Sequence, residues 1–271
     1  MTNTRGFTLV DLLVGLGITG VVLAGVLTVL SHHIRTHTQQ DLTTAMEENL
    51  RIGMGTLADT LRAANYGLPA GNLAQWVPWV PSFANNPKIT TGSPAALSIA
   101  GCTPLPVATL VNAAVRGATT LTVQSAVAGQ TLAQLLNTGA RRLIQLDNSQ
   151  TAHVVAVTSG SITIDTNPAT AGNQGLESAY PAGTPLCRVD VQTFSIATDA
   201  ETGLPQLMLS ANDGSALRTV ADGISDLRVA TVTAGQTYRV TLTARTERAE
   251  PLTHTVLRRS LQSDITLRNP S

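Results

Sequence analysis

The chain has 271 residues, and its 17 Lys and Arg balance its 17 Asp and Glu, so its formal net charge is zero. A neutral chain lacks the broad basic surface typical of nucleic-acid-binding proteins. Hydrophobic residues make up 43% of the chain and charged residues only 13%, a composition that can build a core and argues against wholesale disorder. The length allows one large domain or two small ones.

The first element in chain order is an apolar segment near the N-terminus. A short polar leader, residues 1–6, precedes Phe7, and residues 12–30 carry no charge. A helix over this stretch rises about 1.5 Å per residue and spans about 30 Å, which matches the hydrocarbon core of a bilayer. A secretory signal would place its cleavage site after the apolar run, whereas here the small residue, Gly6, precedes it. We therefore expect residues 7–31 to form a retained transmembrane helix whose N-terminus lies in the cytoplasm.

Asp11 places a carboxylate inside this apolar run. A charge in a membrane helix costs about 2.5 to 3.5 kcal/mol on insertion scales, so it normally has a partner or a way to water. One interpretation is that Asp11 reaches the interface near the start of the helix and complements the positive end of the helix dipole. The other interpretation is that Asp11 pairs with a cation from another chain, inside the membrane or in a filament.

The next segment is amphipathic and is expected to continue the same helix. Apolar residues recur at three- and four-residue steps while polar residues occupy the other face, a period typical of a helix that packs on one side. Residues 32–66 are therefore the outer half of one long rod, which ends near Tyr66–Gly67 with Gly67 as its cap. The apolar positions are Leu42, Met46, Leu50, Gly53 or Met54, Leu57, Leu61 and Ala64.

Residues 67–106 are rich in Pro, Gly, Asn and Ser, and we expect an irregular loop there. Trp76 and Trp79 in this loop either anchor it to the head or form an exposed surface for a partner.

From residue 107 to residue 271, short runs of alternating apolar and polar residues indicate antiparallel strands. The clearest is the run from Tyr238 to Arg245, of which one face should be buried and the other wet. Ser159–Gly160 is typical of a hairpin turn. The expected fold class is thus α+β, a long N-terminal helix packed on an antiparallel β-sheet head. The expected strands are Thr120–Gln124, Arg142–Asp147, Ala152–Thr158, Ser161–Asp165, Arg188–Ala197, Gln206–Ser210, Asp226–Thr233, Thr237–Ala244 and Thr253–Leu267.

The run from Arg5 to Val14, RGFTLVDLLV, resembles the class III signal of type IV prepilins and type II secretion pseudopilins. The resemblance implies a pilin-like fold and cleavage by a prepilin peptidase between Gly6 and Phe7, followed by N-methylation of Phe7. It also implies a role for Asp11, which matches the position where the family usually has a glutamate. That glutamate is proposed to pair with the N-terminal amine of a neighbouring subunit during assembly.

The segment from Glu47 to Gly67 and the last fifty residues resemble PilW-like minor pilins. This implies a structural subunit held in the inner membrane with its head in the periplasm, and later in the pilus, at its tip. The implied partners are the prepilin peptidase and other minor and major pilins. Two other functions are open: a minor pseudopilin of the J type in type II secretion, or a signal-anchored periplasmic binding module.

The sequence contains none of the short catalytic motifs that mark common hydrolases, nucleotide-binding enzymes or metalloproteases. We therefore expect no enzyme, no cofactor and no small-molecule substrate. His33 and His37 lie one helical turn apart and could in principle bind a metal, but a solvated face is the favoured interpretation. Asp165 and Asn167 could begin a calcium loop, but an ordinary turn is favoured, and no metal site is predicted.

Cys102 and Cys187 are the two cysteines of the chain. With the predicted topology both lie outside the cytoplasm, where thiols can be oxidised, so we expect a disulfide between them. The alternative is two separate buried thiols.

Overall fold

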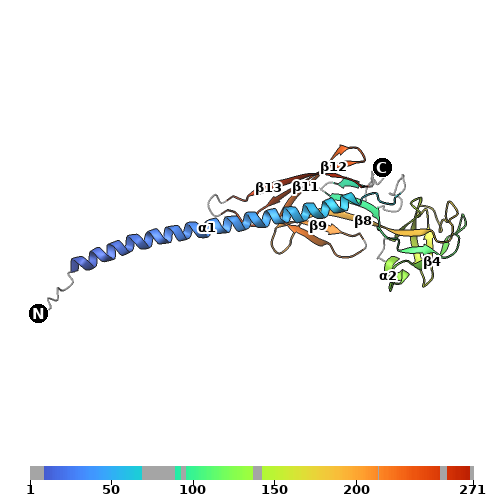
Figure 1. Cartoon of the computed structure of the whole chain (residues 1–271), viewed down its shortest axis with the longest axis horizontal. Coiled ribbons are helices and arrows are strands. Elements are labelled where there is room, and N and C mark those ends of the chain that lie inside the picture. Colours follow the sequence, from blue (N-terminus) through green and yellow to red (C-terminus); the bar gives the residue numbers. More distant parts are fainter. Residues whose placement is uncertain are drawn as a thin grey trace.

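The computed structural model describes residues 9–68, 89–92, 96–136, 142–212, 214–250 and 255–268. One long helix, α1, is followed by strands and a single short helix, α2 (Figure 1). Every pairing between named strands is antiparallel. The fold is therefore α+β, as the sequence predicts.

Helix α1 (Leu9–Arg62) has 54 residues, which corresponds to a length of about 80 Å at about 1.5 Å per residue. Its first half projects away from the rest of the protein, and its second half lies within the head (Figure 1). The change coincides with the switch from uniform to periodic hydrophobicity. The large apolar side chains between Leu12 and Leu30 are each at least 53% exposed, whereas the buried ones begin at Met46.

The end of α1 differs slightly from the prediction. The helix ends at Arg62 instead of near Tyr66, and a series of turns continues to Gly67. Asn65 has a positive φ of 63°, and its N–H donates to the carbonyl of Ala100 at 2.9 Å, so the chain leaves the helical path there. Asparagine is the residue that replaces glycine most readily in this left-handed conformation. Gly67 also has a positive φ, of 66°, but it lies beyond the helix end.

Two sheets enclose the second half of α1. The first has the strand order β1-β2-β8-β9-β10, and the second has the order β11-β12-β13. Helix α1 contacts β12 and β13 of the second sheet and β10 of the first, and Figure 1 shows it running between the two sheets. Arg259 on β13 pairs with Glu47 on α1 and ties the second sheet to the helix. The bounds are β1 Ile89–Gly92, β2 Ala96–Cys102, β8 Pro185–Thr198, β9 Pro205–Ser210, β10 Arg218–Asp222, β11 Ile224–Thr233, β12 Thr237–Arg245 and β13 Arg258–Thr266.

The core between the helix and these sheets follows the predicted periodicities. Leu57 and Leu61 of α1 are fully buried, and so is Phe194 of β8. Along β12 buried and more exposed residues alternate as predicted, with Val240 and Leu242 facing the core. The helix thus supplies the centre of one hydrophobic core, and each sheet covers one side of it.

The remaining strands form a closed barrel, so the expectation of a simple pilin-like sheet is wrong. The ring runs β8-β3-β4-β7-β6-β5, and β5 pairs back with β8 to close it. The barrel has its own hydrophobic core, to which α2 contributes three buried leucines. The β6–β7 connection is the hairpin predicted at Ser159–Gly160. The bounds are β3 Ala108–Leu110, β4 Thr120–Ser125, α2 Leu132–Leu136, β5 Leu143–Leu146, β6 Gln150–Val157 and β7 Ser161–Asp165.

Strand β8 belongs to both parts of the head. Its first residues, Pro185–Arg188, pair with β3 and β5 in the barrel, and residues 189–198 pair with β2 and β9 beside the helix. Residues 103–188 therefore form an insertion between β2 and the second half of β8. In Figure 1 this insertion lies at the end of the head farthest from the N-terminal end of α1.

The predicted irregular loop over residues 67–106 is wrong for part of its length, because β1 and β2 lie inside it. Strand β2 is almost wholly buried between β1 and β8, and this tertiary pairing overrides the turn-rich composition around it. Trp76 and Trp79 lie outside the described residues.

Candidate functional site

The residues predicted to undergo processing, Gly6 and Phe7, lie outside the described residues. Asp11 lies in the first turns of α1, and its side chain is outside the described part of the chain. The roles of these three residues therefore remain predictions.

The apolar half of α1 is the feature of the described chain most directly tied to function. It is the one helix among the described residues that is long and apolar enough to cross a membrane, and none of its most apolar window is buried within the protein. A helix of this kind near the N-terminus fits a membrane anchor or a signal sequence. Exposing so much apolar surface to water is unfavourable, which means that the segment needs a lipid or protein environment.

His33 and His37, on the turn that follows the apolar segment, are both exposed, as the solvated-face interpretation predicts. Asp165 is buried at the end of β7, where Oδ1 accepts hydrogen bonds from the backbone N–H groups of Asn167 at 2.9 Å and Gln174 at 3.0 Å. That arrangement is an ordinary polar turn. Within the described ranges, no three His, Cys, Asp or Glu side chains come together as metal ligands.

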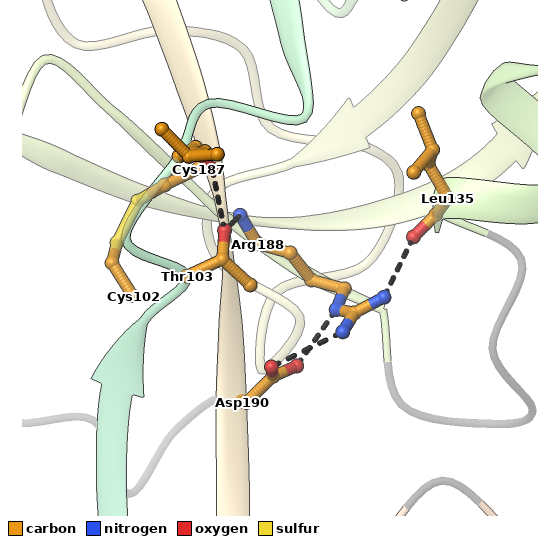
Figure 2. A network of polar contacts seen from close by, with 7 residues as sticks. Cys102, Thr103, Leu135, Cys187, Arg188 and Asp190 are labelled. Carbon is orange, nitrogen blue, oxygen red and sulfur yellow. Dashed lines mark hydrogen bonds and ion pairs between the residues drawn. A yellow bond between two sulfur atoms is a disulfide. The ribbon is translucent and has the colours of Figure 1, made fainter. Parts of the chain in front are cut away.

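The disulfide expected between Cys102 and Cys187 is present (Figure 2). It lies where the barrel joins the rest of the head, at residues 102–103 and 187–188, which we call the neck. Cys102 is the last residue of β2, and Cys187 lies in the barrel part of β8, so the bond joins the two chain segments through which the insertion leaves and re-enters the sheet. Their Cα atoms are 5.6 Å apart, and the bond closes a sequence separation of 85 residues. The disulfide therefore closes a loop that contains the whole barrel.

A polar network beside the disulfide fixes the same neck (Figure 2). The Arg188 guanidinium donates to both carboxylate oxygens of Asp190, at 2.7 and 3.1 Å, and to the carbonyl of Leu135 at 3.2 Å. The backbone N–H of Arg188 donates to the Thr103 hydroxyl at 3.3 Å, and the N–H of Thr103 donates to the carbonyl of Arg188 at 2.8 Å. These bonds hold the end of α2 and both neck segments in one orientation.

The sequence contains one sign of this network. Arg188 and Asp190 are two residues apart in a predicted strand, so their side chains share a face and can pair. Their link to Leu135 depends on the barrel closing, which no local pattern indicates. These contacts orient the barrel relative to the rest of the head.

Charged pairs on the outer surface shift a few pKa values. Arg239 on β12 donates to both oxygens of Asp264 on β13, at 2.7 and 2.8 Å. These hydrogen bonds lower the pKa of the Asp264 carboxyl and raise the pKa of Arg239. Backbone N–H groups of Thr202 and Glu201 lower the pKa of Asp199 in the β8–β9 turn. These groups lie apart from the neck and stabilise strand pairing and a turn.

Protein-family models, curated proteins and solved structures were each compared with the chain, and none of the three comparisons produced a match.

Proposed function

We propose that this protein is a membrane-anchored minor pilin, a subunit that helps to initiate or cap a type IV pilus after prepilin peptidase processing. The observation that carries the proposal is the division of α1 into an apolar half that is exposed along its whole length and a half that forms the core of the head. One continuous helix can then lie in the membrane before assembly and among other subunits' helices after it.

The N-terminal sequence supports the same function. The run from Arg5 to Val14 has the form of a prepilin signal, in which Gly6 and Phe7 flank the scissile bond immediately before the apolar half of α1. Removal of residues 1–6 would leave Phe7 as the first residue, four positions before Asp11 in the sequence. A carboxylate in that place can form an ion pair with the N-terminal amine of a neighbouring subunit. This pair would offset the free-energy cost of placing the Asp11 charge in an apolar setting.

The position of the barrel favours a role at the tip. In Figure 1 the barrel lies beyond the end of the helix, farthest from the segment that would enter the membrane. A subunit repeated along a shaft must pack its head against the subunits above and below it, whereas a subunit used once at the end leaves such an insertion exposed. The head would then act through its surface, without bond chemistry.

The first test is complementation of a deletion strain with the wild-type chain or with Asp11→Ala. The wild type should restore surface pili and twitching without changing the secretion of exoproteins. We expect Asp11→Ala to reduce piliation severalfold while cleavage at Gly6 continues, because the variant loses the charge that pairs subunits but keeps the scissile bond. Asp41→Ala is the matched control, since it removes an exposed carboxylate from the same helix outside the apolar segment.

Piliation that is unchanged in Asp11→Ala would remove Asp11 from the assembly step. Loss of exoprotein secretion, with twitching intact, would instead identify the chain as a minor pseudopilin.

A further inference from the structure

Helix α1 carries a cluster of basic and titratable side chains immediately after its apolar segment. His32, His33, Arg35 and His37 lie within six residues, and all four are exposed. From Leu12 to Gln40 the sequence contains no Asp or Glu, and the nearest carboxylates along the chain are Asp11 and Asp41. We call these four residues the histidine collar.

The collar would lie at the level of the lipid head groups if the apolar segment crosses a bilayer. Residues 12–30 span about 30 Å, and the collar begins two residues later. No described part of the head covers it: the first buried residue of α1 is Met46, about 13 Å further along the helix at 1.5 Å per residue. If α1 is anchored as proposed, the membrane surface faces the collar, and no described residue of the head lies between them.

The arrangement around the helix fits lipids better than a single bound ion. At about 100° per residue the four side chains extend over roughly 200° of the helix circumference, so they point toward lipids on several sides. Only His33 and His37 share one face at a one-turn spacing, and the described residues supply no third ligand for a metal there. His32 Nδ1 lies 3.4 Å from the Thr36 hydroxyl, whose own proton goes to the backbone carbonyl of His32.

We propose that the histidine collar binds anionic phospholipid head groups in a pH-dependent manner. The inference rests on the proposed membrane anchorage of α1. Arginine stays charged at all physiological pH values, whereas histidine changes its charge between about pH 5 and pH 8. The collar contains one arginine and three histidines. The nearest charged group is Asp41, one turn after His37 and also exposed.

The consequence is a contact between the base of the head and the membrane surface that strengthens at low pH. Anionic lipids attract basic residues near the surface with an energy equivalent to about a fivefold change in binding for each charge. A subunit waiting in the membrane would be held with its head close to the bilayer in an acidic environment and released at neutral pH.

The test is native mass spectrometry of the full chain extracted in a neutral detergent that contains equimolar phosphatidylglycerol and phosphatidylcholine, with EDTA present. We expect the ratio of bound phosphatidylglycerol to bound phosphatidylcholine to rise at least fivefold from pH 8 to pH 5.5. The variant H32Q/H33Q/H37Q should lose this rise, because glutamine keeps the helix propensity and polarity but does not titrate. Arg51→Gln is the matched control, an exposed cation of α1 located within the head.

A lipid preference that does not change with pH, or that persists unchanged in the triple variant, would overturn the inference. So would a preference that appears only when Zn²⁺ replaces EDTA, which would indicate a site bridged by metal. Extraction of the wild-type chain from membranes by alkaline carbonate would contradict the membrane anchorage itself, and a failure of that kind is distinguishable from a failure of the collar alone.

Discussion

Replacing Cys102 and Cys187 together by serine is expected to lower the free energy of unfolding by about 4 to 5 kcal/mol, the loop-entropy value for a closed loop of this length. The disulfide closes a sequence separation of 85 residues that includes the entire barrel. Without it, the unfolded chain gains the freedom of that loop, while the folded barrel keeps its strand pairing through β8. The measurement is denaturant unfolding of the full chain in detergent, followed by near-ultraviolet circular dichroism.

The wild type under reducing conditions provides the matched control for the serine pair. It should unfold at the same denaturant concentration as the double variant, and the variant should not respond to the reductant. Equal midpoints for the oxidised wild type and the variant would contradict a stabilising role of the bond. If the substitution accelerates hydrogen exchange more for barrel amides than for amides around α1, the loss of stability is located at the neck.

Phe194→Ala is expected to destabilise the protein by about 3 to 5 kcal/mol, because it removes a large side chain from a site with no solvent exposure. Phe194 lies in the core that α1 shares with both flanking sheets. We expect hydrogen exchange to accelerate mainly in α1 beyond Met46 and in its sheets, with a smaller change in the barrel, which has a separate core.

Ile162→Ala is the matched control for this experiment, since Ile162 is fully buried in the barrel core. It should accelerate exchange mainly in the barrel and leave the helix region less affected. Uniform acceleration of the whole head by both variants would contradict the division into two cores.

The secondary structure was largely predictable because the hydrophobic periods are clear. The expected strand Ser161–Asp165 matches β7, and Thr237–Ala244 differs from β12 by one residue. Strand β3 has three residues, too few for an alternation to be recognised. Strand β10 was also missed, because its sequence, RTVAD, contains little alternation.

The barrel could not be predicted, because its closure depends on pairings between distant parts of the chain. Strand β8 pairs with β3 and β5 through its first four residues and with β2 through later ones. Its burial pattern shifts phase at the change of partners, because Leu186 and Val189 are buried and the two residues between them are half-buried. The predicted strand begins at Arg188, so it leaves out most of the part of β8 that closes the barrel.

The candidate site, too, was predictable only in part. The disulfide was predictable from the topology of the chain and the presence of only two cysteines. The network of Arg188, Asp190 and Leu135 was not predictable. It joins two residues of β8 to the end of α2, and only the folded barrel brings these elements close together. The roles of Gly6, Phe7 and Asp11 derive from the sequence alone, and the processing of the N-terminus is the central claim to be tested.

The most direct test is the mass of the N-terminal peptide from membrane-extracted protein, produced with and without its prepilin peptidase. We expect a chain that begins at Phe7 and carries one methyl group on its amine when the peptidase is present, and the intact leader when it is absent. A peptide that retains residues 1–6 in the presence of active peptidase would contradict processing of the chain as a prepilin. The apolar half of α1 would then be an anchor only, and the protein would be a periplasmic binding module held at the membrane.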